Sequence, residues 1–293
     1  MSNSIIKIER VGFFLRPNKP ELKSEYEKLK LSFEKCGIDV FIEDKSAEMI
    51  DLIGVAIKTL FEKSDILISL GGDGTLLSTV RKSFYVNKPI LPINGGNLGF
   101  LAGMKTEEVY PFISKLVNGT YRIERRKILK IEFEDGEKNF ALNDILITNR
   151  ERMKMSSIQV YTDTEDSSEK RLLNRYYGDA LIVSTPTGST AYNLSSGGPI
   201  LHPEMSSYIL TPIAPHSLTQ RPIVLPSRLN IHVGLELSDG VLVIDGQDIV
   251  NLIKGNFIKV SMCKKPIEII RVEDYNFFNT LREKLKWGDT NID

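Results

Sequence analysis

Residues 71–75, Gly-Gly-Asp-Gly-Thr, combine three glycines with one carboxylate directly after an apolar run. The pattern predicts a strand over 65–70, a tight turn, and a helix from about 75 to 85. At the carboxyl end of a parallel strand, such a turn offers backbone N–H groups and a helix N-terminus, which favour phosphate. Asp73 could there accept a proton from an attacking hydroxyl or hold Mg²⁺. The alternative is a tight turn in which the aspartate only caps the helix.

A second glycine turn follows another predicted strand. Residues 94–100, Asn-Gly-Gly-Asn-Leu-Gly-Phe, come directly after the apolar run 89–93. Because parallel strands end at the same edge of a sheet, we expect both turns on one edge. Two glycine turns there would form a crevice with little side-chain bulk, as a nucleotide requires. The alternative is that both turns need glycine for steric reasons alone.

A third segment, 178–200, is rich in small hydroxyl residues and glycine. Such a composition is typical of a flexible linker. However, the apolar run 180–183 leads into it, and it contains Tyr192 and two prolines. We therefore favour an ordered ligand loop, in which hydroxyls and N–H groups bind a ribose or phosphate and Tyr192 stacks on a base.

The elements that must position these segments change character along the chain. Strands predicted over 10–15, 38–42, 65–70 and 89–93 alternate with predicted helices, one of which spans about 46–63. This alternation predicts a Rossmann-like α/β domain with a parallel sheet over residues 1–118. We expect the helical C-terminal segment, 274–293, to pack on it.

From about residue 120 the apolar residues alternate with a period of two. In 229–237, for example, every second residue is apolar, and His232 lies between them, so we expect this histidine at the surface. Many short strands separated by turn residues predict an all-β domain over residues 119–273, with a β-sandwich-like architecture.

The composition excludes several classes of partner. Lys and Arg total 38, as do Asp and Glu, so there is no net charge to attract nucleic acid or an anionic membrane. Cys36 and Cys263 lie far apart, as in proteins of the reducing cytosol. No apolar run approaches the ~20 residues of a membrane span. The three histidines have no metal-binding spacing. We expect a cytoplasmic protein with no nucleic-acid or membrane partner and no metal bound by protein residues alone.

Taken together and in this order, the motifs resemble the NAD kinase family. They are GGDGT (71–75), NGGNLGFLA (94–102), the Asn143-Asp144 pair and the segment 178–200, followed by 211–226 and 241–247. The resemblance implies phosphoryl transfer from ATP or polyphosphate, with Mg²⁺, to the 2′-hydroxyl of the adenosine ribose of NAD. Two alternatives are a lipid or sugar kinase, since such kinases carry similar glycine turns, and an NAD(P)-binding module without activity.

The resemblance also implies roles for individual residues. Asp73 would be the base or positioner at the 2′-hydroxyl, with Gly72 and Gly74 allowing close approach and Phe100 walling the adenine side. The other implied NAD contacts are Asn143, Asp144, Asp179, Thr187, Thr190, Ala191, Tyr192 and Ser195. Asp179 would come from a neighbouring subunit of a homo-oligomer, a dimer or tetramer. The family usually has Asn-Glu where this chain has Asn143-Asp144, so the shorter carboxylate would reach less far.

The donor site is less visible in the sequence. The glycine turns contain no lysine, so cations for the ATP phosphates must come from other segments. Arg125, Arg126 and Lys127 are candidates, although a solvated strand edge is the favoured interpretation of these three residues.

Overall fold

The computed structural model describes residues 7–96, 99–151, 154–164 and 167–288. The chain forms two compact units, the first from Met1–Arg125 with Ile267–Asp293 and the second from Arg126–Pro266. The sequence placed the boundaries at 118 and 273. They differ because two further strands, β6 (Arg122–Arg126) and β19 (Ile267–Arg271), join the sheet of the first unit. No helix in the described part of the chain is long and apolar enough to cross a membrane.

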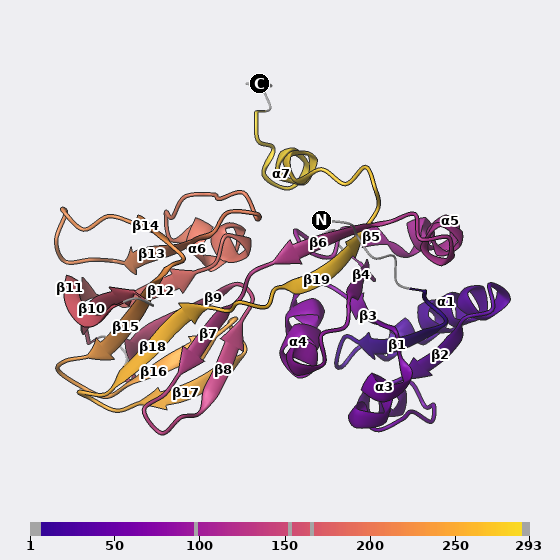
Figure 1. Cartoon of the computed structure of the whole chain (residues 1–293), viewed down its shortest axis with the longest axis horizontal. Coiled ribbons are helices and arrows are strands. Elements are labelled where there is room, and N and C mark those ends of the chain that lie inside the picture. Colours follow the sequence, from indigo (N-terminus) through magenta and orange to yellow (C-terminus); the bar gives the residue numbers. More distant parts are fainter. Residues whose placement is uncertain (1–6, 97–98, 152–153, 165–166, 289–293) are drawn as a thin grey trace. The chain divides into compact units, whose positions relative to one another are not determined.

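The first unit contains a seven-stranded sheet, as expected for a Rossmann-like fold (Figure 1). Its order is β2-β1-β3-β4-β19-β6, and β5 also pairs with β4. The pairs β1–β2, β1–β3, β3–β4, β4–β5 and β4–β19 are parallel. The strands not yet given are β1 (Arg10–Leu15), β2 (Asp39–Ile42), β3 (Ile66–Gly71), β4 (Ile90–Asn94) and β5 (Met104–Lys105).

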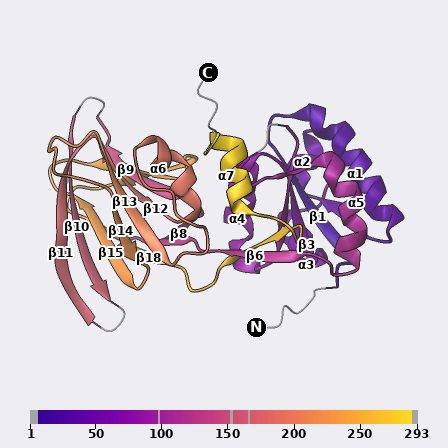
Figure 2. The ribbon, with the colours of Figure 1, turned by 90° about the horizontal axis from the view of Figure 1, so that it is seen from above.

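Helices cover both faces of this sheet, which explains why its central strands are apolar throughout. On one face, α1 (Lys23–Lys35) and α5 (Thr106–Val117) lie side by side and share a core with Phe13 and Ile68 (Figure 2). On the other face, α3 (Ile57–Lys63) and α4 (Asp73–Ser83) pack against β1, where Phe14 contacts Phe61. After β19, helix α7 (Phe277–Leu285) begins at Asn276, whose side chain accepts the N–H of Phe278.

The helix predicted over 46–63 is wrong as a single element. It is two helices, α2 (Asp44–Glu48) and α3, separated by a turn in which Asp51 has φ 57°. A Cβ at Gly54 would lie 2.7 Å from the Cα of Asp44, so the chain folds back closely on the start of α2. The turn interrupts an apolar pattern that otherwise has helical spacing.

The second unit is a sandwich of two antiparallel six-stranded sheets, as predicted. Their orders are β11-β10-β15-β18-β7-β8 and β14-β13-β12-β9-β16-β17. Both sheets contribute to one core, which contains Ile131 and Val233 from the first sheet and Ile147 and Val183 from the second. The strands are β7 (Leu129–Glu132), β8 (Lys138–Ala141), β9 (Asp144–Asn149), β10 (Ser156–Thr164), β11 (Ser167–Gly178), β12 (Ala180–Ser184), β13 (Ser207–Ile213), β14 (Ile223–Pro226), β15 (Leu229–Leu235), β16 (Gly240–Ile244), β17 (Asp248–Leu252) and β18 (Phe257–Met262).

His232 of β15 is buried, which corrects the expectation of a surface position. Its Nε2 lies 2.8 Å from Oδ2 of Asp163, and Asn230 donates to the other oxygen of that carboxylate at 2.6 Å. Alternation along one strand shows that His232 faces away from the core between the sheets. The pattern of one strand cannot show which residues lie beside His232 on the neighbouring strands. These are Tyr161 of β10 and Lys259 of β18, which pair with it across the sheet.

Candidate functional site

The two glycine turns leave the same edge of the parallel sheet, as predicted. Gly71 at the end of β3 pairs with Asn94 at the end of β4, and the N–H of Gly95 donates to the carbonyl of Gly71 at 3.1 Å. Positions 97 and 98 of the second turn lie outside the described residues.

Asp73 connects the two turns. It is the first residue of α4, and its carboxylate accepts three backbone hydrogen bonds from the second turn, from Phe100 to Oδ2 at 2.9 Å and from Leu101 and Ala102 to Oδ1 at 3.0 and 2.8 Å. Each carboxylate oxygen has two lone pairs, so the described residues leave one acceptor position at Oδ2. Asp73 therefore fixes the second turn against the start of α4.

The glycines of the turns divide into two kinds. A Cβ at Gly71 would lie 2.2 Å from Oγ1 of Thr75, and one at Gly99 would lie 2.0 Å from Oδ1 of Asp73, so packing requires glycine at both positions. A Cβ at Gly72 or Gly96 would meet no atom within 4 Å. Steric need inside the protein thus explains Gly71 and Gly99 but not Gly72 and Gly96.

A cavity of about 310 Å³ lies beside the glycine turns. Its walls include four glycines of the two turns, together with Arg16 and with Lys19, whose ammonium group pairs with Glu21 of the same wall at 2.6 Å. Arg16 follows β1 directly, and its N–H donates to the carbonyl of Leu70 at 2.9 Å. Neither cation is predicted from the sequence, although the position of Arg16 directly after a strand of a parallel sheet is a signal that could have found it.

The cations considered at 125–127 have other partners. Arg125 pairs with Glu268 at 3.1 Å, and Lys127 donates to the hydroxyl of Ser206 at 2.7 Å. Arg126 is buried and donates to Oγ1 of Thr187 at 3.3 Å, so a solvated strand edge is the wrong interpretation for this residue.

The segment 178–200 is ordered, as predicted. After β12 the chain forms a 3-10 turn at Thr187–Thr190 and a short helix, α6, at Tyr192–Ser195. The buried amide of Asn193 donates to the carbonyls of Ser189 and Pro199, both at 3.1 Å, and accepts the hydroxyl of Thr211 at 2.7 Å. These bonds fix a segment whose composition alone is typical of a linker.

Most of the predicted NAD contacts belong to this segment of the second unit, and the Asn143-Asp144 pair lies against it. A Cβ at Gly188 would lie 2.2 Å from the carbonyl oxygen of Asn143, so the 3-10 turn packs directly on the Asn143-Asp144 pair. Tyr192 is 49% exposed, as a stacking side chain requires. The remaining positions range from buried to exposed: Thr187 is buried, Asn143, Thr190 and Ala191 are partly exposed, and Asp179 and Ser195 are exposed.

Asp144 is buried beside a second carboxylate. Burial, and next the charge of Asp245, raise the pKa of Asp144 to about 7. Asp245 in turn accepts the backbone N–H groups of Leu142, Asn143 and Asp144 at 3.0, 2.8 and 3.2 Å. The sequence analysis gave Asp245 no role, although its Asp-Gly pair at the end of an apolar strand indicates a turn.

The described residues contain no group of three His, Cys, Asp or Glu side chains that could hold a metal ion. Mg²⁺ commonly uses one or two carboxylates together with substrate phosphates and water. Asp73, a single carboxylate at the start of α4, fits an ion carried by a nucleotide rather than one held by the protein alone.

Comparison with known proteins agrees with this arrangement along the whole chain. Residues 11–121 match the ATP-NAD kinase N-terminal domain and residues 142–272 match the ATP-NAD kinase C-terminal domain. The NAD kinase of Sulfurimonas denitrificans is 45% identical over 292 residues, which cover 99% of this chain and all of the relative. That of Wolinella succinogenes is 41% identical over 288 residues, covering 96% of this chain and 97% of the relative.

Two solved structures share the fold. Yeast NADH kinase complexed with NADH has a TM-score of 0.87 at 23% identity, covering 97% of this chain and 89% of that one. An NAD kinase from Archaeoglobus fulgidus in complex with ATP has a TM-score of 0.76 at 24% identity, covering 94% and 98%. Because both domain models match in order and close relatives align from end to end, this chain belongs to the NAD kinase family.

Proposed function

We propose that this protein transfers a phosphoryl group from ATP to the 2′-hydroxyl of the adenosine ribose of NAD and so produces NADP. The observation that carries the proposal, given the family, is Asp73. This carboxylate stands at the carboxyl edge of the parallel sheet, is held by three backbone N–H groups, and retains one acceptor position at Oδ2.

Asp73 acts on the acceptor hydroxyl. Its remaining position at Oδ2 accepts the hydrogen bond of the 2′-hydroxyl and takes the proton as the new oxygen–phosphorus bond forms, a contribution of ~10²–10⁴-fold in rate. The bond between the γ-phosphorus and the β–γ bridging oxygen of ATP breaks in the same step, and ADP leaves. Gly72 and Gly74 allow the ribose to come close to the backbone, and Phe100, fixed through its own N–H, walls the adenine side.

The donor phosphates lie at the cavity with glycine walls, where Arg16 supplies positive charge and Lys19 would exchange its pairing with Glu21 for a phosphate. When carried by these phosphates, Mg²⁺ would supply charge neutralisation for the transferred group. Asp73 would contact the ion or its water only in place of the 2′-hydroxyl, because the described residues leave a single acceptor position on its carboxylate. Polyphosphate offers the same chemistry to these cations and is a second donor to test.

The remaining NAD contacts come from the second unit, at Asn143, Asp144, Thr187, Thr190, Ala191, Tyr192 and Ser195. We further propose a homo-oligomer, a dimer or tetramer, in which exposed Asp179 contacts NAD bound to a neighbouring subunit. A cytoplasmic location accords with two unpaired cysteines.

Two alternatives remain testable. A lipid or sugar kinase needs a hydrophobic or polyol pocket, and both the family and the ordered 178–200 segment favour a dinucleotide instead. An NAD(P)-binding module without activity would keep all of the contacts and lack turnover.

The test is an assay of the purified protein with NAD, ATP and Mg²⁺ in which NADP is followed by a dehydrogenase specific for it. Asp73→Asn should lower kcat by at least ~10²-fold. It should also weaken NAD binding. The side-chain NH₂ group of asparagine replaces a carboxylate oxygen and would face a backbone N–H of the second turn, so two donors would meet and the turn would shift.

Asp135→Asn is the matched control, since Asp135 also accepts a backbone N–H, from Glu137 at 2.9 Å, but in an exposed turn of the second unit. It should match the wild type. NAD binding without NADP from either donor would establish a silent module, and the absence of both binding and product would favour a lipid or sugar acceptor.

A further inference from the structure

Arg271, the last residue of β19, is 4% exposed and has three contacts within the first unit. Its Nε donates to Oε2 of buried Glu124 at 2.8 Å, and its Nη1 donates to the carbonyl of Leu101 at 2.6 Å. The guanidinium lies 4.6 Å from the ring centre of Tyr275. The fork geometry of arginine thus joins a strand of the sheet to the second glycine turn.

Leu101 is held through both its backbone N–H and its backbone carbonyl. Its N–H donates to Oδ1 of Asp73 at 3.0 Å, and its carbonyl accepts from Arg271. A continuous path therefore runs from Glu124 through Arg271 and Leu101 to Asp73. A shift of Arg271 moves Leu101, and with it one of the three donors that orient the Asp73 carboxylate.

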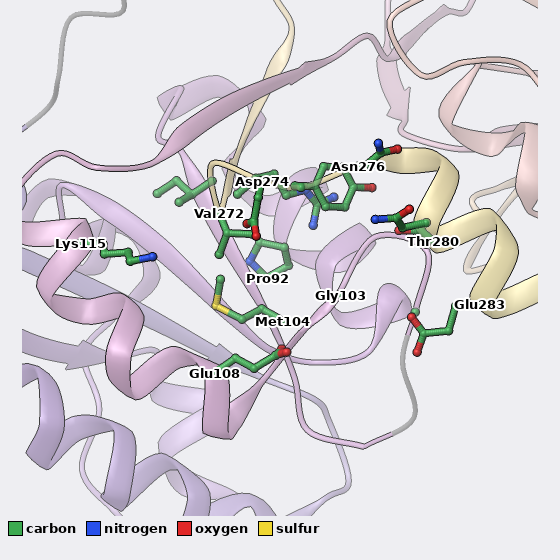
Figure 3. Close-up of a pocket in the computed structure, with 15 residues that line it drawn as sticks. Pro92, Gly103, Met104, Glu108, Lys115, Val272, Asp274, Asn276, Thr280 and Glu283 are labelled. Carbon is green, nitrogen blue, oxygen red and sulfur yellow. The ribbon is translucent and has the colours of Figure 1, made fainter.

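A cavity of about 430 Å³ lies beside this path. Arg271, Gly99 and Gly103 line it, and Figure 3 shows Met104 and Glu108 on one side and Thr280 and Glu283 of α7 on the other. Side-chain packing from the cavity cannot replace the hydrogen bond to Leu101. The space also accommodates a substituted side chain without overpacking.

We propose that Arg271 is a positioning residue for phosphoryl transfer, acting on Asp73 through the backbone of Leu101. The proposal rests on the proposed function, in which the Asp73 carboxylate meets the acceptor hydroxyl. Arg271 itself contacts no substrate in this role. Its effect should therefore fall on kcat more than on the KM for NAD.

Arg271→Lys is the first test, because lysine keeps a positive charge beside buried Glu124 but lacks the fork that reaches Leu101 as well. We expect kcat to fall by ~10-fold or more, with a smaller change in KM, as for displacement of a catalytic group by a fraction of an ångström. Arg125→Lys is the matched control. Arg125 pairs with Glu268 across the same two strands, at an exposed position, and this variant should match the wild type.

A double-mutant cycle separates positioning from general damage to the fold. If Arg271 acts through Asp73, Arg271→Lys should cause no further loss of kcat in the Asp73→Asn background. Equal losses in both backgrounds would overturn the proposal. If the Arg271→Lys variant does not fold, a double variant takes its place in the cycle. It combines Arg271→Gln with Glu124→Gln, so that neither buried charge is left without its partner.

Hydrogen exchange tests the contact without relying on activity. The amides of Phe100, Leu101 and Ala102 should exchange faster in Arg271→Lys than in the wild type or in Arg125→Lys. Unchanged exchange would overturn the proposed path even in an active enzyme. Faster exchange with undiminished kcat would overturn the catalytic consequence, whereas a wild type without NAD kinase activity would instead contradict the proposed function.

Discussion

Two aspartates, one in each unit, organise a turn in the same way. Asp73 accepts the N–H groups of residues 100–102, and Asp245 accepts those of residues 142–144. In both cases the backbone N–H groups donate to a carboxylate instead of to the backbone carbonyls of a strand or helix. The carboxylate thereby fixes a segment whose N–H groups would otherwise need such partners. The sequence identifies Asp73 as a chemical residue, but it cannot show this second role, because the donors lie 27–29 positions away.

The two kinds of glycine can be tested by a matched pair of substitutions. Gly99→Ala places a Cβ against the Asp73 carboxylate and should lower both thermal stability and kcat. Gly72→Ala meets no atom within 4 Å and has an ordinary φ of −108°, so its melting temperature should equal that of the wild type. Its kcat/KM should nevertheless fall if substrate approaches the backbone there. An unimpaired Gly72→Ala enzyme would mean that Gly72 is not needed for close approach.

The buried Asp144 predicts a pH dependence of stability. Its pKa of about 7 in the folded protein lies above the ordinary 3.8, so the protonated form favours folding. This contribution is complete below about pH 4 and is lost as the pH rises through about 7. Asp144→Asn removes it. Between about pH 5 and about pH 8, the free energy of unfolding of the wild type should fall by ~1 kcal/mol or more relative to this variant.

Chemical denaturation across this pH range, with Asp135→Asn as the control, measures the difference. Parallel curves for the wild type and Asp144→Asn would show that Asp144 titrates normally in the folded protein.

At the scale of elements, the local sequence pattern was sufficient where strands are mostly apolar. It located β1, β3 and β4 and the common edge of the two turns. It failed at β6, whose sequence RIERR carries three charged arginines, and at β19, whose partner β4 is far away in the chain. Both strands are recognisable only through long-range pairing. The charged residues of β6 are explained by their partners, since buried Glu124 pairs with Arg271 and buried Arg126 bonds to Thr187.

At the scale of the whole molecule, the two cores should respond separately to mutation. Ile269 of β19 is fully buried in the first unit, so Ile269→Ala should cost ~2–5 kcal/mol there and leave the unfolding of the second unit unchanged. Ile249, on the edge strand β17, is 70% exposed, and Ile249→Ala should cost less than ~0.5 kcal/mol. Exchange rates of core amides in each unit provide the measurement. A loss of protection in both units from Ile269→Ala would indicate a single cooperative fold.

The return of the chain into the first sheet has a consequence for biosynthesis. Strand β19 occupies a place between β4 and β6, although the ribosome releases it only after every strand of the second unit. The nascent chain therefore has all the strands of its second unit available while the first still lacks one from the interior of its sheet. The unit that begins the polypeptide is the last to be completed, and a chain released early would carry the Asp73 turn on an unfinished sheet.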